Sequence, residues 1–114
     1  MCSSDLRPGG NAIELGNINT LIALETKLWG KKPIWVTEYG WQTPPDRIFG
    51  VSFARQAAYV RQSFAIARAN PRITVMVWFM LRDDTNVGVG WQSGMLTAKN
   101  KKKPAFSVFA RLPH

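Results

Sequence analysis

Two short apolar segments separated by an amphipathic helix constrain this chain more than any other feature. The segments 33–37 and 73–80 are rich in β-branched and aromatic residues and have almost no polar face, as expected of strands buried between two layers. Between them, over 52–69, apolar residues recur every three or four positions, which predicts a helix with one buried stripe. A strand, a crossover helix and a second buried strand form a βαβ unit, whose strands are parallel and adjacent.

Helix-boundary signals place the other elements around this unit. Apolar residues recur at helical spacing over 18–29, and Gly30 stands just past them, as glycine does at the C-terminal end of many helices. Ser52 is expected to cap the helix over 52–69. Pro104 predicts that a last helix begins there, because proline fits the first helical turn. The expected order is helix, strand, helix, strand, helix, which is an α/β fold.

The length of the chain limits how much of a known architecture it can hold. The chain has 114 residues, whereas a complete (β/α)8 barrel has roughly 250. We expect residues 11–114 to form one ordered unit and residues 1–10 to be a start that is disordered or does not belong to the fold. The opening residues lack the apolar core of a secretory signal, which leaves the localisation unassigned and a secreted parent enzyme still open.

Charge and residue counts argue against several kinds of site. The net charge is +8, but the basic residues form one run over 99–103 and are otherwise scattered. We therefore expect these side chains to be solvated and expect no nucleic-acid partner. Cys2 and His114 are the one cysteine and the one histidine, which argues against a metal centre and against Ser-His catalysis. We expect no metal, no cofactor and no membrane span. Hydrolytic chemistry would have to come from carboxylates.

Glu38 is the carboxylate in the most unusual place. It ends an apolar strand and is followed by Tyr39, Gly40 and Trp41. A charge at such a position costs free energy unless it has a partner or a use. Position alone leaves two interpretations open. Glu38 is structural, at the start of a solvated loop or in an ion pair with Arg82 on the neighbouring strand, or it is catalytic.

The segment Pro33–Trp41, with the sequence PIWVTEYGW, resembles the seventh strand of the clan A glycoside hydrolases. This large clan of retaining enzymes has TIM-barrel catalytic domains and includes cellulases and many β-galactosidases. In the clan the glutamate that ends this strand is the nucleophile, and the resemblance assigns that role to Glu38. The next strand ends in an aromatic residue that stacks on the sugar, a position held here by Trp78. The resemblance covers residues 17–112. It includes a similar tail over residues 81–84, 94–96, 103–106 and 109.

The resemblance implies a partial (β/α)8 TIM barrel made of its C-terminal βα units, and a retaining double displacement. Such an enzyme uses one carboxylate to attack the anomeric carbon and a second to protonate the leaving oxygen, about 5 Å apart. In the clan the second, acid/base glutamate ends the fourth strand, and no such segment is present in this chain. We therefore expect a glycosidase fragment that takes a carbohydrate substrate, needs the N-terminal barrel half and is inactive alone. Two parallel strands would also leave both sheet edges and much of one sheet face unpaired.

Aromatic residues and an arginine complete the expected sugar site. Trp78 would offer its flat face to the pyranose, with a core tryptophan as the competing interpretation. Trp41 and Trp91 would add sugar contacts, unless they anchor their loops. Arg82 and Tyr39 are the donors expected to keep the nucleophile ionised.

Other functions and roles also remain open at this stage. One alternative is a non-catalytic carbohydrate-binding barrel fragment that uses its tryptophans as a sugar platform, and another is a small basic protein that binds nucleic acid. Asp83 and Asp84 are expected to hold the loop after the second strand, by capping it or by surrounding Arg82, rather than to touch a sugar.

Overall fold

The computed structural model describes residues 13–113 of the chain. Its main elements follow the predicted order of helix, strand, helix, strand, helix, with a short 3-10 helix added at the start. They are η1 (Leu15–Asn17), α1 (Ile18–Trp29), β1 (Ile34–Tyr39), α2 (Phe53–Ala69), β2 (Ile73–Trp78) and α3 (Pro104–Phe109). The expectation for residues 1–10 lies outside the described residues.

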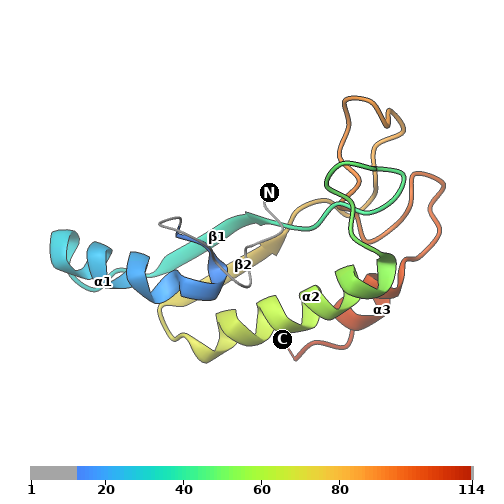
Figure 1. Cartoon of the computed structure of the whole chain (residues 1–114). Helices are drawn as coiled ribbons and strands as arrows, with labels where there is room; N and C mark the ends of the chain where they lie inside the picture. The colour runs from blue at the N-terminus through green and yellow to red at the C-terminus, as the bar shows by residue number, and fades with distance from the viewer. Residues whose placement is uncertain (1–12, 114) are drawn as a thin grey trace.

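The two strands form a parallel pair (Figure 1). Ile34 of β1 lies opposite Ile73 of β2, and Tyr39 lies opposite Trp78 at the other end. α2 crosses back between them, so both strands point toward the same end of the molecule. The predicted βαβ unit is therefore confirmed, and the loops that follow the two strands lie together at the carboxyl ends of the strands.

Local signals set where the helices begin and end. The Ser52 hydroxyl accepts a hydrogen bond from the backbone N–H of Arg55 at 3.2 Å, so Ser52 caps α2 as predicted. Gly30 has a φ of 76° and donates its N–H to the carbonyl of Thr26. This left-handed conformation suits glycine at the end of α1. Pro104 occupies the first turn of α3, again as predicted.

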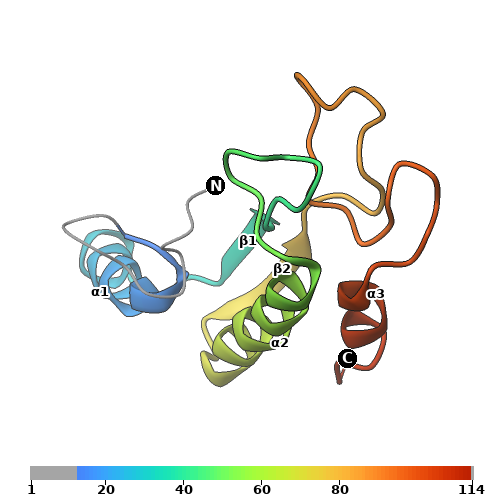
Figure 2. The ribbon, with the colours of Figure 1, turned by 45° about the vertical axis from the view of Figure 1, so that its right-hand side comes forward.

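α2 covers one face of the sheet and contributes to the core (Figure 2). Val60 of α2 is fully buried and belongs to the same apolar cluster as Tyr39 and Trp78 at the strand ends. α3 packs beside α2, where the rings of Phe64 and Phe109 meet edge to face with their centroids 5.3 Å apart. The core therefore lies between the sheet and these two helices.

The opposite face of the sheet has no covering layer within the described residues. Trp35 of β1 is 65% exposed and Val77 of β2 is 46% exposed. α1 likewise has no buried residue. The unpaired sheet face expected from the sequence is confirmed, and an apolar surface of this kind is typical of a contact with further protein.

Arg72, which precedes β2, fixes α1 to the sheet. Its guanidinium forms an ion pair with Glu25 and donates a hydrogen bond to the hydroxyl of Thr26 at 2.7 Å. Its Nε–H donates to the carbonyl of Lys32 at 2.8 Å. One side chain therefore joins the last turns of α1, the connection to β1 and the start of β2.

Candidate active site

Glu38 lies at the carboxyl end of the parallel pair. It is the penultimate residue of β1, and the next residue, Tyr39, lies opposite Trp78, the last residue of β2. The N–H of Phe79 donates to the carbonyl of Tyr39 at 2.7 Å, which extends the pairing past β2. Glu38 and the end of β2 therefore share one edge of the sheet, as the parallel arrangement predicts.

The Glu38 side chain is exposed and forms no hydrogen bond or ion pair with another described residue. Arg82, its expected ion-pair partner, places Nη1 3.5 Å from Oδ1 of Asn100 instead. The Tyr39 hydroxyl accepts a hydrogen bond from the indole N–H of Trp41 at 3.0 Å. The ion pair expected under the structural interpretation is therefore absent here, and neither expected donor holds the Glu38 carboxylate in this part of the chain.

Trp78 is buried, with only 8% of its surface exposed. Its indole N–H donates to the carbonyl of Ser93 at 2.8 Å. Its ring meets that of Tyr39 edge to face, with centroids 6.0 Å apart and planes at 72°. In this arrangement Trp78 joins the end of β2 to the loop that follows it, which agrees with the core interpretation better than with an open stacking platform.

The two loop tryptophans differ in accessibility. Trp41 is 3% exposed and packs on Tyr59 of α2 with ring centroids 4.2 Å apart, so it anchors the loop after β1. Trp91 is 44% exposed. Its backbone N–H donates to a carboxylate oxygen of Asp84 at 2.7 Å, and its ring meets that of Phe79 at 5.7 Å. Of the expected sugar contacts on tryptophan, Trp91 is the one that stays accessible.

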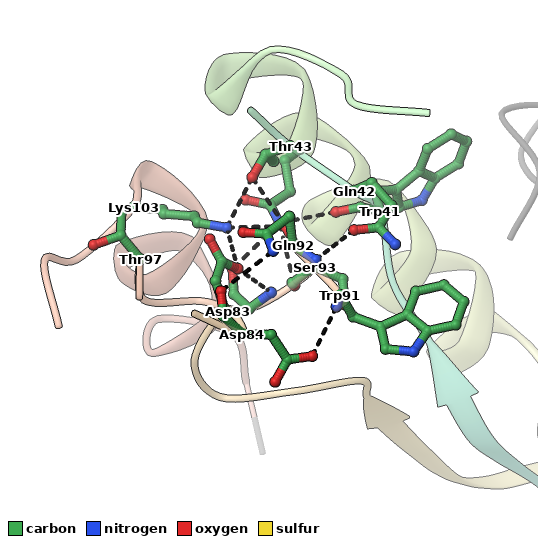
Figure 3. Close-up of polar contacts among 12 residues, drawn as sticks. Trp41, Gln42, Thr43, Asp83, Asp84, Trp91, Gln92, Ser93, Thr97 and Lys103 are labelled. Atoms are coloured by element: carbon green, nitrogen blue, oxygen red, sulfur yellow. Dashed lines mark hydrogen bonds and ion pairs between the residues drawn. The ribbon is translucent and has the colours of Figure 1, made fainter. Parts of the chain in front are cut away.

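A buried ion pair lies beneath both loops (Figure 3). The Lys103 ammonium donates to a carboxylate oxygen of Asp83 at 2.7 Å, to the hydroxyl of Thr43 at 2.8 Å and to the carbonyl of Gln92 at 3.1 Å. The side chains of Lys103 and Asp83 are 1% and 2% exposed. Thr43 follows β1, whereas Asp83 and Gln92 follow β2. One cation therefore ties the two loops together.

Burial acts on both charges of this pair. Loss of solvation raises the pKa of Asp83 above its usual 3.8 and lowers the pKa of Lys103 below its usual 10.5. The hydrogen bond and attraction between the two groups oppose both shifts, and the N–H of Gly94 also favours the charged form of Asp83. Such a pair adds little net stability, but losing one partner leaves a buried charge uncompensated.

The described residues contain no group of three or more acidic, histidine or cysteine side chains arranged to hold a metal ion. Over the same part of the chain, no helix has the length and apolarity needed to cross a bilayer.

Residues 13–109 match the sequence model of the glycosyl hydrolase catalytic core family. This match covers most of the chain. The chain belongs to the glycosyl hydrolase catalytic core family. None of the curated proteins matches this glycosyl hydrolase core in sequence.

Solved structures of β-glucuronidases have a similar fold. The enzyme from Ruminococcus gnavus is 21% identical over 83% of this chain and 17% of its own, with a TM-score of 0.63. The enzyme from Faecalibacterium prausnitzii is 18% identical over 91% of this chain and 20% of its own, with a TM-score of 0.60. The enzyme from an uncultured Clostridium sp. is 22% identical over 85% of this chain and 19% of its own, with a TM-score of 0.62. This glycosyl hydrolase core spans about a fifth of the length of these neighbours, and the likeness concerns the fold.

Lys103 is the main residue of this glycosyl hydrolase core that sequence reasoning misplaced. It was expected in a solvated basic run over 99–103, yet it is 2% exposed, whereas Lys101 and Lys102 are exposed. Pro104 is the sequence signal that could have distinguished Lys103 from the exposed lysines. The chain turns into α3 at Pro104, so the residue before it points in a different direction from the rest of the run. The expected loop-holding role of Asp83 is confirmed, through Lys103 rather than Arg82.

Gln56 of α2 is a second buried polar residue that the sequence did not reveal. It is fully buried, and its Nε2 lies 3.1 Å from the carbonyl oxygen of Trp41, 3.3 Å from that of Ser93 and 3.4 Å from that of Gly94. Trp41 belongs to the loop after β1 and the other two belong to the loop after β2. Gln56 therefore fixes both loops of the glycosyl hydrolase core to the helix beneath them.

Replacing Gln56 by methionine should lower the free energy of unfolding of the chain by about 1–3 kcal/mol, because the loop carbonyls lose their buried donor. Urea denaturation followed by circular dichroism measures this change. The matched control is Gln62→Met on the exposed side of the same helix, which should change stability by less than about 0.5 kcal/mol. Equal effects of the two substitutions would contradict the role assigned to Gln56.

Proposed function

We propose that residues 13–113 form the C-terminal βα units of a clan A retaining glycoside hydrolase with a (β/α)8 barrel, and that Glu38 is its nucleophile. One observation carries this proposal. Glu38 is an exposed carboxylate without a partner among the described residues, at the carboxyl end of a parallel strand pair. In barrels the catalytic groups stand at this end of the strands, and the loops around Glu38 are held by buried contacts.

The proposed reaction is a double displacement. The Glu38 carboxylate attacks the anomeric carbon, and the bond to the leaving oxygen breaks as a second carboxylic acid protonates that oxygen. Water then hydrolyses the glycosyl ester at Glu38, with the second group acting as base. Asp83 and Asp84 are poor candidates for this second group, since Asp83 pairs with Lys103 and Asp84 accepts from the N–H of Trp91. The resemblance puts the acid/base glutamate at the end of the fourth barrel strand, so we place this residue outside the described residues.

Further protein is proposed to complete the barrel. The open sheet face with Trp35 and Val77 supports this, because such apolar surface is expected to be covered in a folded enzyme. The small share of the β-glucuronidase chains that this chain spans supports it too. The substrate would then be a carbohydrate bound between these units and the remaining strands.

Covalent trapping tests the nucleophile in a complete barrel that contains this chain. The probe is a glycoside fluorinated beside the anomeric carbon and carrying a dinitrophenyl leaving group. The fluorine destabilises the positively charged transition states, while the good leaving group keeps the first step fast, so the glycosyl-enzyme accumulates. Peptide mass mapping is expected to locate the adduct on Glu38. An adduct on another carboxylate would refute the assignment.

The chain alone should not turn over nitrophenyl glycosides, because the acid/base carboxylate of the proposed pair lies outside it. Release of nitrophenol by the purified 114-residue chain, followed by absorbance, measures this. The complete barrel serves as the positive control. Sustained turnover by the chain alone would overturn the proposal that it supplies only half of the catalytic pair.

A further inference from the structure

The loops after β1 and β2 line an open, largely apolar pocket at the carboxyl end of the strands. Its volume is about 510 Å³, within the range of roughly 300–1,000 Å³ that is typical of ligand pockets. Its apolar lining is unusually accessible, with Ile48 84%, Phe49 65% and Val89 83% exposed. Pro45, Val87 and Trp91 also belong to this lining. Soluble proteins rarely gather so many exposed apolar side chains without a ligand or partner for them.

Hydrogen bonds hold the walls of this pocket in place. A carboxylate oxygen of Asp46 accepts from the backbone N–H groups of Ile48 and Phe49, both at 2.8 Å. On the other wall, Asp84 accepts from the N–H of Trp91 at 2.7 Å. The indole of Trp91 points away from the polar network around Lys103 (Figure 3). The pocket is therefore a formed feature of the two loops.

A short series of contacts connects this pocket to Glu38. The ring of Trp91 meets the ring of Phe79 edge to face at 5.7 Å. The N–H of Phe79 donates to the carbonyl of Tyr39 at 2.7 Å, and Tyr39 directly follows Glu38. The pocket and Glu38 therefore lie at the same end of the parallel strand pair, where the loops after β1 and β2 begin.

The lining of the pocket suits an apolar ligand better than a sugar ring, because most of the side chains that form it are apolar. Sugar hydroxyls need hydrogen-bond partners when they leave water. The side-chain oxygen of Gln42 already accepts from the N–H of Gln92, and one of the two Asp46 carboxylate oxygens serves the loop. The indole N–H of Trp91 and the guanidinium of Arg47 have no hydrogen-bond partner among the described residues. The pocket therefore has a largely apolar lining and two free hydrogen-bond donors.

We propose that this pocket binds the aglycone, so that the substrate class is glycosides with an aromatic or extended apolar leaving group. This inference rests on the proposed function, because it needs Glu38 to act on the glycosidic bond. Trp91 stacks on the aglycone, the side chains of Ile48, Phe49 and Val89 surround it, and the free donors face its oxygen atoms.

Isothermal titration of the 114-residue chain with methylumbelliferyl β-glucoside and with methyl β-glucoside tests the pocket. The two probes share the sugar and differ in the aglycone, so the first should bind at least about tenfold more tightly. Trp91→Ala should weaken binding of the first probe on the order of threefold to tenfold, because an aromatic contact is lost. Trp29→Ala is the matched control, since Trp29 is a 67% exposed tryptophan on α1, away from the loops.

Val89→Asp is a second variant for the same binding measurement, and its effect does not depend on the packing of Trp91. Val89 is 83% exposed, so the substitution should preserve the fold while it places a charge in the apolar pocket and reduces methylumbelliferyl glucoside binding. Equal affinity for the two glucosides, or loop variants that bind like the Trp29→Ala control, would overturn the inference. Glu38 trapping and aglycone binding are separate readouts. Tighter binding of the methylumbelliferyl glucoside without an adduct on Glu38 would support the pocket and refute Glu38 as nucleophile. An adduct on Glu38 together with equal affinity for the two glucosides would support the nucleophile and refute the pocket.

Discussion

Replacing Glu38 by glutamine should reduce glycoside hydrolysis by the complete barrel on the order of a million-fold, the scale seen when a catalytic nucleophile is removed. An amide cannot form the glycosyl ester, but it keeps the size of the side chain, so sugar binding should remain largely intact. Because Glu38 has no partner among the described residues, the substitution should leave the stability of the 114-residue chain nearly unchanged. Measurements of kcat/KM, of inhibitor binding and of thermal unfolding separate these effects.

Glu25→Gln is the matched control for Glu38. It also removes a carboxylate charge, but Glu25 lies on α1, away from the strand ends, and the remaining amide oxygen can still accept from the guanidinium of Arg72. Its kcat should stay within about threefold of the parent value. Azide should rescue the smaller Glu38→Ala variant and give a glycosyl azide of inverted configuration, because azide occupies the vacated nucleophile position. Retained hydrolysis in Glu38→Gln would refute the assignment.

Replacing Lys103 by methionine should lower the free energy of unfolding of the chain by about 3–5 kcal/mol. Methionine is similar in length, but it leaves the Asp83 carboxylate buried without its cation and removes the donor shared by Thr43 and Gln92. Urea denaturation measures the change. Lys101→Met, at an exposed position of the same basic run, is the control and should alter stability by less than about 0.5 kcal/mol.

The loss caused by Lys103→Met should depend on pH. Burial already raises the pKa of Asp83, and removal of the cation raises it further. A raised native-state pKa favours the protonated form, so stability falls as pH rises from the usual range of the carboxyl through its native-state value. The penalty should therefore shrink as pH falls through that value. Adding Asp83→Asn to Lys103→Met should recover part of the loss at neutral pH, and a pH-independent penalty would contradict this account.

The helix ends and the parallel strand pair that carry the site could be predicted from the sequence. Ser52, Gly30 and Pro104 act within one helical turn of themselves, so their effects on α1, α2 and α3 follow from local chemistry. The order of two apolar strands around one amphipathic helix leaves little choice but a parallel pair. Glu38 could therefore be placed at the carboxyl edge beside the end of β2 before any contact was known.

Side-chain surroundings could not be predicted in the same way. Trp78 and Trp91 are chemically identical, yet Trp78 is 8% exposed and donates to Ser93, whereas Trp91 is 44% exposed beside the apolar pocket. Arg82 was expected to meet Glu38 but lies near Asn100. Each outcome depends on residues brought together by the two loops, whose mutual packing has no periodic signature.

The sequence by itself determined the parallel strand pair, the helix ends and the position of Glu38 at the strand ends, because these depend on local propensity and on the period of apolar residues. Only the tertiary structure decided that Lys103 lies buried against Asp83 while its neighbours in the basic run are solvated. It also decided that Gln56 holds both loops. The physical reason is that burial of a polar side chain is favourable only where distant backbone and side-chain partners converge, and that convergence is a property of the folded chain.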